Sequence, residues 1–228
     1  SGSAHPVIVI DPGHCPSVHH IDRRTGLDVS DYENEPEMHD VYKVALIVRH
    51  QLQKAGYHVV MTKKSVDQRV NLAKRARIAN RAHAALALSI HDQAGANGGI
   101  GFRQGNNTVY YQHDGDYRAT PAGKKVYFRN PHVAKLSKRY GEIFRRQRAR
   151  AQGVHINLQD NVGYNLGSRG LAPGNIWLVQ LLSTVPWVYN EAGGNSSGRS
   201  GLDGADRHTY AAGLVAGVEH SVPIAKQH

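Results

Sequence analysis

The chain has 228 residues, of which 40% are hydrophobic and 20% charged, a composition typical of a folded protein and not of a disordered one. No apolar run approaches the roughly 18 residues of a membrane-spanning helix, so we expect no membrane span. The single cysteine, Cys15, excludes an intramolecular disulfide. The formal net charge of +10 predicts attraction to polyanions such as nucleic acid, anionic lipid or anionic cell wall.

Apolar, β-branched runs predict strands along the chain, and apolar residues at helical spacing predict helices. The first half is predicted to contain a strand at Val7–Ile10, a helix over Pro36–Ala55 closed by Gly56, a strand at His58–Thr62, a helix over Asp67–Ala82 and a strand at Leu86–Ile90. The second half is predicted to contain a strand at Thr108–Gln112 paired with Ile100–Arg103, a helix over Pro131–Ala151, strands at Ile176–Gln180 and Trp187–Asn190, and a helix over Asp206–His220.

This alternation predicts an α/β fold with a twisted, mostly parallel or mixed sheet of about six strands flanked by helices. We expect one catalytic domain over residues 1–228, with residues 1–5 as a flexible end or a remnant of cloning. The sequence leaves open whether a signal peptide has been removed from the chain. The segments 13–34, 114–130 and 152–174 are long and polar, and loops of that length in a compact domain are usually functional.

Four residues with suitable chemistry fall at predicted strand ends or helix starts. His14 follows the first strand, and His91 closes the third. Glu191 ends the last strand, and Glu37 lies in the first turn of the first helix. If the strands are parallel, all four share the sheet edge at which ligands bind in α/β folds. Two imidazoles and a carboxylate are a standard ligand set for catalytic zinc, and a further carboxylate suits a general base.

Position alone leaves other interpretations open. The chain has fifteen histidines, so a histidine near a strand end is common by chance. Glu35 competes with Glu37, and the His-Glu-x-x-His helix of many zinc proteases is absent from the sequence. Cys15 is interpreted as a small loop residue. The basic run at 145–150 is interpreted as a solvated helix face, and no motif indicates nucleic-acid binding.

The motifs at these positions resemble a known family. Val7–His14, reading VIVIDPGH, resembles the opening motif of the zinc-dependent N-acetylmuramoyl-L-alanine amidases of bacterial cell-wall metabolism. The family's second helix is resembled by residues 67–80, and its second histidine motif by Ser89–His91. The strand that carries its catalytic glutamate is resembled by Val188–Gly193. In that family a glutamate begins the first helix at a set distance from its closing glycine, so Gly56 favours Glu37 over Glu35.

The resemblance implies one Zn²⁺ per chain, held by His14, Glu37 and His91. It implies hydrolysis of the amide between the lactyl group of N-acetylmuramic acid and L-alanine of the stem peptide. Glu191 would take a proton from the attacking water and return it to the leaving amine. Asp11 is a candidate to orient a ligand histidine. The implied partner is peptidoglycan, the implied location the bacterial periplasm or the outside of the cell, and the expected state a monomer without nucleic acid.

The chain also departs from the family's pattern. Asp92-Gln93-Ala94 stands where Ala-Asn-Ala is usual, and Glu191 is followed by Ala192 and two glycines in place of Thr or Cys, Gly and Phe. These changes affect substrate contacts without removing a ligand. Some relatives carry a helix that plugs the zinc site, but segment 114–130 lacks an apolar stripe, so we expect no self-plugging. Two alternatives remain, another zinc peptidase or amidohydrolase acting on cell-wall peptides and a non-catalytic wall-binding module.

Overall fold

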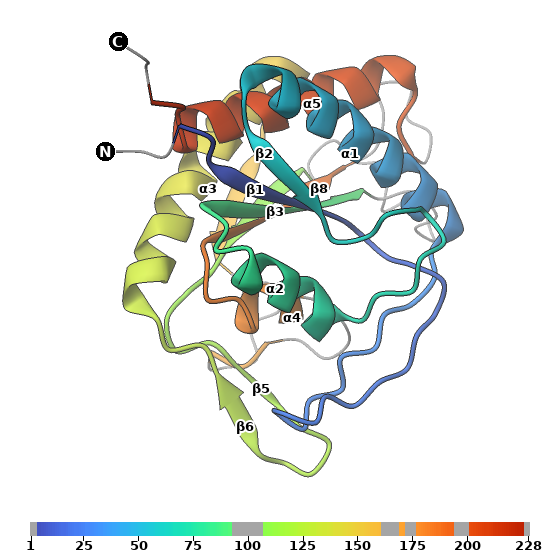
Figure 1. Ribbon diagram of the computed structural model, residues 1–228, viewed down its shortest axis with the longest axis vertical. Helices are drawn as coiled ribbons and strands as arrows, with labels where there is room; N and C mark the ends of the chain where they lie inside the picture. Colours follow the sequence, from blue (N-terminus) through green and yellow to red (C-terminus); the bar gives the residue numbers. More distant parts are fainter. Residues whose placement is uncertain (1–3, 93–106, 161–168, 172–176, 194–200, 226–228) are drawn as a thin grey trace.

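The computed structural model describes residues 4–92, 107–160, 169–171, 177–193 and 201–225. Five helices and eight strands are assigned in these ranges (Figure 1). Their order is β1 (Val7–Pro12), α1 (Glu35–Ala55), β2 (His58–Met61), α2 (Leu72–Arg81), β3 (Leu86–Asp92), β4 (Thr108–Tyr111), β5 (Tyr117–Ala119), β6 (Lys125–Tyr127), α3 (Pro131–Gln152), β7 (Asn157–Asp160), α4 (Leu178–Leu181), β8 (Trp187–Ala192) and α5 (Gly204–Ser221).

Six of these strands form one mixed sheet in the order β2-β1-β3-β8-β4-β7. The first four strands run parallel, β4 is antiparallel to β8, and β7 is parallel to β4. Strands β5 and β6 make a separate antiparallel hairpin. The predicted α/β fold with a six-stranded mixed sheet is therefore confirmed. Among the described residues, no helix has the length and apolar character needed to cross a membrane.

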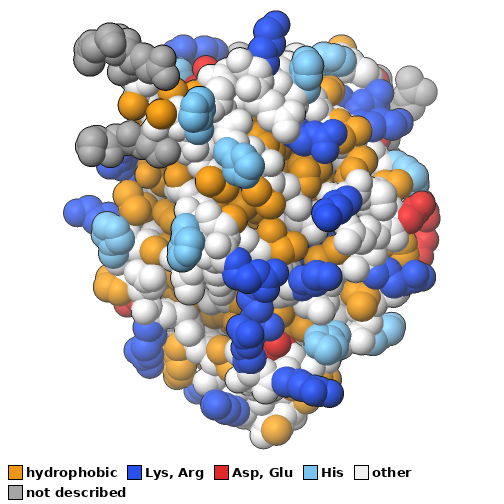
Figure 2. All heavy atoms as spheres, viewed as in Figure 1, with side chains coloured by type: hydrophobic (Ala, Val, Ile, Leu, Met, Phe, Trp, Pro, Cys, Tyr) orange, Lys and Arg blue, Asp and Glu red, His pale blue; other side chains and the backbone are white. Residues whose placement is uncertain are grey.

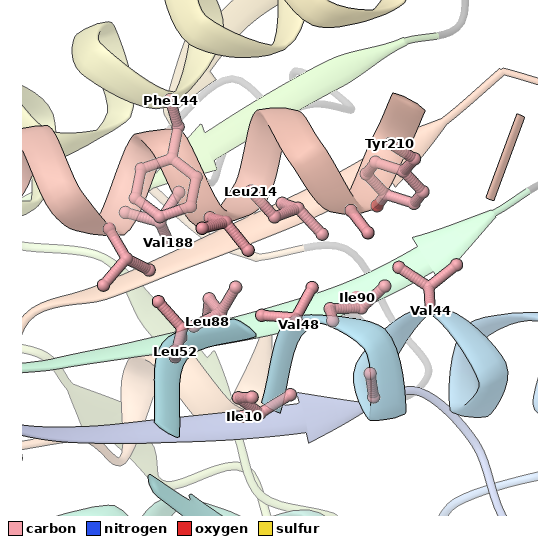
Figure 3. Close-up of a cluster of buried hydrophobic side chains, with 14 of the residues drawn as sticks. Ile10, Val44, Val48, Leu52, Leu88, Ile90, Phe144, Val188, Tyr210 and Leu214 are labelled. Carbon is pink, nitrogen blue, oxygen red and sulfur yellow. The ribbon is translucent and has the colours of Figure 1, made fainter. Parts of the chain in front are cut away.

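Helices cover both faces of this sheet. Helices α1 and α5 pack on one face, with α3 beside them, and α2 and α4 pack on the other (Figure 1). Leu88 and Ile90 of β3 point to the α1 and α5 face, where they meet Val48 of α1 and Leu214 of α5 (Figure 3). Ala87, which precedes Leu88, points to the α2 and α4 face. Parallel strands buried on both faces explain the uninterrupted apolar runs in the sequence.

Helices α3 and α5 approach closely because α5 has glycines at the contact. A Cβ atom on Gly217 would lie 2.8 Å from the ring of Phe144, and one on Gly213 would lie 2.8 Å from the Cα atom of Arg148. Arg148 is fully buried, so the basic run at 145–150 is not wholly a solvated face as predicted. Arg146 and Arg150 are exposed.

Two predicted elements differ from the structure. The predicted strand at Ile176–Gln180 is wrong, because Leu178–Leu181 forms the short helix α4 after Trp177, whose φ is +64°. A short buried apolar run does not distinguish a strand from a helix by periodicity. The helix predicted from Asp67 begins at Leu72, where the side chain of Asn71 caps it by accepting from Lys74 N.

Short strands were missed in the polar segments. Strands β5 and β6 lie within 114–130, and β7 lies within 152–174, all three predicted as loops. They are three or four residues long, with few apolar positions to show a period of two. The pairing predicted for Ile100–Arg103 lies outside the described residues.

Candidate metal centre

The candidate residues meet at one edge of the sheet. Strands β1, β3 and β8 are parallel, so their carboxyl ends lie together, and helix α1 begins at the same edge (Figure 1). The register pairs Pro12 with Ile90 and His91 with Glu191. Histidines from the ends of two strands and a glutamate from the start of a helix are thereby brought together across almost 80 residues of sequence, from His14 to His91.

Three side chains at this edge converge on one point. His14 Nε2 lies 3.1 Å from Glu37 Oε2, and His91 Nδ1 lies 3.0 Å from Glu37 Oε1. One ligand atom from each residue lies within 4.8 Å of the others. Tetrahedral zinc with bonds of about 2.0–2.1 Å places its ligand atoms roughly 3.3 Å apart. The donor set and its spacing therefore fit zinc.

His14 is held in a fixed orientation by its own backbone and by the loop that follows. Its φ is +62°, and its carbonyl oxygen accepts from Lys63 Nζ at 2.6 Å and from Arg75 Nη2 at 3.0 Å. Its Nδ1 donates to the carbonyl of Tyr32 at 2.8 Å, and Asp31 Oδ1 lies 3.5 Å away. A proton on Nδ1 leaves the Nε2 lone pair facing Glu37, the usual arrangement of a metal-binding histidine.

Glu37 is positioned by the cap of helix α1. The side chain of Asn34 accepts from Glu37 N at 3.3 Å and donates from Nδ2 to Glu37 Oε2 at 2.9 Å. The backbone N–H of Asp92 donates to Glu37 Oε1 at 3.2 Å. Pro36 occupies the first turn, where its missing N–H costs no helical hydrogen bond. The buried carboxylate is thus fixed by the residues that start the helix and end β3.

His91 packs between three neighbours. Tyr189 stacks on its imidazole, with ring centroids 4.3 Å apart and planes at 12°. Tyr210 Oη donates to the His91 carbonyl at 2.9 Å. On the other side, Gly13 leaves room for the ring, since a Cβ atom there would lie 2.7 Å from His91 Nε2 and closer still to Cε1. Gly13 is required at this position because the imidazole occupies the space of a side chain.

The electrostatics of the site favour a charged carboxylate beside a cation. Burial alone would lower the pKa of His14, but the charge of Glu37 and hydrogen bonds to Asp31 and Glu37 raise it well above its ordinary value. Burial alone would raise the pKa of Glu37, but His14 and His91 hold it well below its usual range. Glu37 is therefore ionised at neutral pH, as a zinc-binding carboxylate must be.

Glu191 lies next to this cluster. It is the register partner of His91 on the adjacent strand, so both side chains point to the same face of the sheet. It is half-buried, and its backbone carbonyl accepts from Arg148 Nη2 at 2.9 Å. A cavity of about 20 Å³, lined by His14, His91 and Tyr189 among others, lies against the same cluster and has room for about one water molecule.

The hydrogen bonds of the Asp11 side chain go to residues other than the two candidate histidines. Its carboxylate accepts from Thr62 Oγ1 at 2.7 Å, from Ser89 Oγ at 2.9 Å and from Arg75 Nη1 at 2.9 Å. Arg75 in turn donates to the His14 carbonyl. Asp11 therefore supports the His14 loop through Arg75, and Asp31 is the carboxylate that lies beside the His14 ring.

The competing candidates lie elsewhere. Glu35 is exposed and pairs with His39 at 2.9 Å, so the carboxylate in the cluster is that of Glu37. Cys15 Sγ is buried and donates to the carbonyl of Val70. Sequence reasoning missed the supporting residues Asn34 and Asp31, although an asparagine three residues before Glu37 is a recognisable helix cap.

Comparison with known proteins agrees with this geometry. The sequence model of the N-acetylmuramoyl-L-alanine amidase family matches residues 8–218. The chain belongs to this family. The match includes both candidate histidines, helix α1 with Glu37 and strand β8 with Glu191. Among curated protein sequences, none matches this amidase.

Solved structures of amidases share its fold. The N-acetylmuramyl-L-alanine amidase of Mycobacterium smegmatis is 20% identical with a TM-score of 0.62, and the alignment covers 97% of this chain and 99% of that one. The catalytic domain of CwlV, an amidase of Bacillus (Paenibacillus) polymyxa var. colistinus, is 19% identical with a TM-score of 0.61 over 96% and 99% of the two chains. An amidase of Clostridium difficile 630 is 18% identical with a TM-score of 0.58 over 96% and 97%.

Proposed function

We propose that this amidase binds one Zn²⁺ through His14, Glu37 and His91 and hydrolyses the amide between N-acetylmuramic acid and L-alanine of the peptidoglycan stem peptide. The observation that carries the proposal is the convergence of three ligand atoms, each from a different element, within 4.8 Å. Family membership supports the reaction, and the donor set supports the choice of zinc.

When bound, zinc supplies a Lewis acid that polarises the amide carbonyl and lowers the pKa of water from 15.7 to about 7. His14 and His91 would each present one imidazole nitrogen to the metal, and a hydrogen bond from His14 and the ring stacked on His91 fix the two side chains. Glu191 accepts the proton of the attacking water and then donates it to the leaving nitrogen. The C–N bond breaks, and the products are a lactyl carboxylate on the sugar and a free amino group on L-alanine.

Substrate, location and assembly are part of the same proposal. We infer that residues 1–228 form one monomeric catalytic domain that acts on peptidoglycan in the bacterial periplasm or outside the cell. Figure 2 shows that Lys and Arg side chains outnumber Asp and Glu on the face in view and are spread across it. A net charge of +10 distributed in this way complements an anionic wall, and no recognised motif favours nucleic acid.

The experiment combines metal content with product analysis. Purified peptidoglycan is digested, and released fragments are identified by mass. We expect intact stem peptides with free L-alanine amino groups. Glu191→Gln is expected to keep one zinc per chain and to slow release by roughly 10²–10⁴-fold. Glu37→Gln is expected to lose zinc, and Glu35→Gln, its exposed neighbour, to keep both zinc and activity.

Other outcomes would favour the alternatives. Fragments cut within the peptide would identify a zinc peptidase, and binding to the wall without products would identify a non-catalytic module. A Glu191→Gln variant as fast as the parent would contradict the assigned role. In segment 114–130 the structure has the β5–β6 hairpin and no helix. We therefore expect cleavage without an activating partner, and a strict need for one would contradict this.

A further inference from the structure

A second cavity adjoins the candidate metal centre. Its volume is about 280 Å³, and its walls come from the loop that supports His14 and from the β5–β6 hairpin. The lining residues are Asp28, Ser30, Tyr32, Arg118, Ala119, Thr120 and Pro121. Tyr32 belongs to both sites, because it lines the cavity and its carbonyl accepts from His14 Nδ1 at 2.8 Å. The cavity and the metal centre are therefore neighbours that share Tyr32.

The cavity presents one positive and one negative side chain. Arg118 points away from the hairpin face on which Tyr117 and Tyr127 contact each other, with ring centroids 5.4 Å apart. Burial lowers the pKa of Arg118 to about 10, and the charge of Asp28 opposes the shift, so the guanidinium is a partly desolvated cation at neutral pH. Asp28 is fixed at the wall because its Oδ1 accepts from both N and Oγ of Ser30.

A lone anion or a lone cation would match only one of these charges. A carboxylate alone would face Asp28, and an ammonium alone would face Arg118. A group that carries both an ammonium and a carboxylate would satisfy both walls at once. The side chain of a diamino acid in the stem peptide ends in such a group when the ammonium and carboxylate share one carbon.

The chain limits how far the cavity can lie from the metal centre. Asp28 lies four positions before Tyr32, and an extended chain spans at most about 3.3–3.6 Å per residue, so the two residues are at most roughly 14 Å apart. L-Alanine follows the scissile amide directly, so the third residue begins roughly 7 Å further along an extended peptide. Its side chain adds further reach, so a stem peptide bound at the metal centre is long enough to bring its third side chain to the cavity.

We propose that Arg118 and Asp28 form a specificity site for a zwitterionic diamino acid in the stem peptide. The inference rests on the proposed amidase function and adds the substrate class to it. Arg118 binds the carboxylate by charge-assisted hydrogen bonds, and Asp28 binds the ammonium. Neither residue touches the reacting amide, so both act on the choice of substrate.

The test compares four synthetic substrates. One is N-acetylmuramoyl-L-alanine, and three are muramoyl tripeptides with meso-diaminopimelate, its side-chain carboxamide or L-lysine at the third position. We expect kcat/KM to be roughly 10- to 100-fold higher for the diaminopimelate peptide than for the other two tripeptides, the range for hydrogen bonds to charged groups. The dissociation constants of the Glu191→Gln variant, measured by calorimetry, should show the same order.

Three variants assign the preference to the cavity. Arg118→Gln should bring the three tripeptides to within about threefold of one another. Asp28→Asn should reduce the preference while leaving discrimination against the carboxamide. Lys125→Gln removes one positive charge from the other face of the same hairpin, where Lys125 lies over the Tyr117 ring, and should keep the full preference.

Two results would overturn this inference alone. One is wild-type protein that cleaves N-acetylmuramoyl-L-alanine and all three tripeptides without preference. The other is an Arg118→Gln variant that loses the same factor on all four substrates, which would indicate a structural role. If wild-type protein with zinc cleaves neither the four substrates nor purified peptidoglycan, the proposed amidase function itself is overturned.

Discussion

The contact between Gly13 and His91 gives a sharp test of the metal centre. In Gly13→Ala, the new methyl group would lie 2.7 Å from His91 Nε2 and closer to Cε1, about 1 Å inside the van der Waals optimum of 3.5–4.0 Å. The imidazole cannot yield freely, because Tyr189 stacks on it and Tyr210 holds its carbonyl. The ring, and with it Nδ1, must therefore move by roughly 1 Å.

A displacement of that size is costly at a reacting centre. A misplacement of 1 Å is worth roughly 100-fold in rate, and loss of support for a metal ligand weakens metal binding by about 10- to 100-fold. We expect Gly13→Ala to lose activity on peptidoglycan by about that factor and to release zinc to a chelator at lower concentration. The assays are kcat/KM and zinc affinity by competition.

The matched control is Gly204→Ala in the first turn of α5. Among the described residues, a Cβ atom there would come within 4 Å of Arg207 Nη2 alone, at 3.9 Å, so the same substitution should leave zinc affinity and activity unchanged. A Gly13→Ala variant whose zinc affinity and kcat/KM lie within twofold of the parent's would refute the reasoning. The His91 ring would then have more space beside residue 13 than the structure shows.

Two further predictions separate local support of the metal centre from general stability. Asn34→Ala and Asn130→Ala each remove a helix cap, so each should lower the free energy of unfolding by about 1 kcal/mol. Because Asn34 also donates to Glu37, Asn34→Ala alone should weaken zinc binding. Equal zinc affinities of the two variants would contradict this. Arg77 lowers the pKa of Asp22 to about 2, so their pair stabilises the fold above about pH 4, and this contribution disappears as the pH falls towards 2. Urea denaturation of Arg77→Gln should show a loss of roughly 1–2 kcal/mol at pH 7 that shrinks towards pH 2; a loss independent of pH would contradict it.

Elements with local start and stop signals were predicted almost to the residue. Helix α1 runs over Glu35–Ala55 against the predicted Pro36–Ala55, and α3 over Pro131–Gln152 against Pro131–Ala151. In both, an asparagine cap and a proline mark the start, and a glycine with positive φ marks the end. Helix α4 carries no such signals, and burial against the sheet fixes its conformation.

The candidate site was predictable where sequence position determines spatial position. A residue at the end of a parallel strand reaches one edge of the sheet wherever it lies in the chain, which is why sequence position alone could place His14, His91 and Glu191 near one another. Their support was not predictable in the same way. Arg75 bridges Asp11 and Asp31 under the His14 loop, but a buried arginine looks like any surface arginine in a helix sequence.

The contacts made by Tyr210 and Arg148 have a consequence for biosynthesis. Tyr210, near the last residues of the chain, holds the His91 carbonyl, and Arg148 holds that of Glu191 while lying over the Tyr210 ring, 4.6 Å from its centroid. Helix α5 follows every proposed zinc ligand in the sequence, so a nascent chain that already contains these ligands lacks the hydrogen bond from Tyr210 to the end of β3 until α5 is made. The support of the His91 strand end therefore forms later than the proposed ligand set itself.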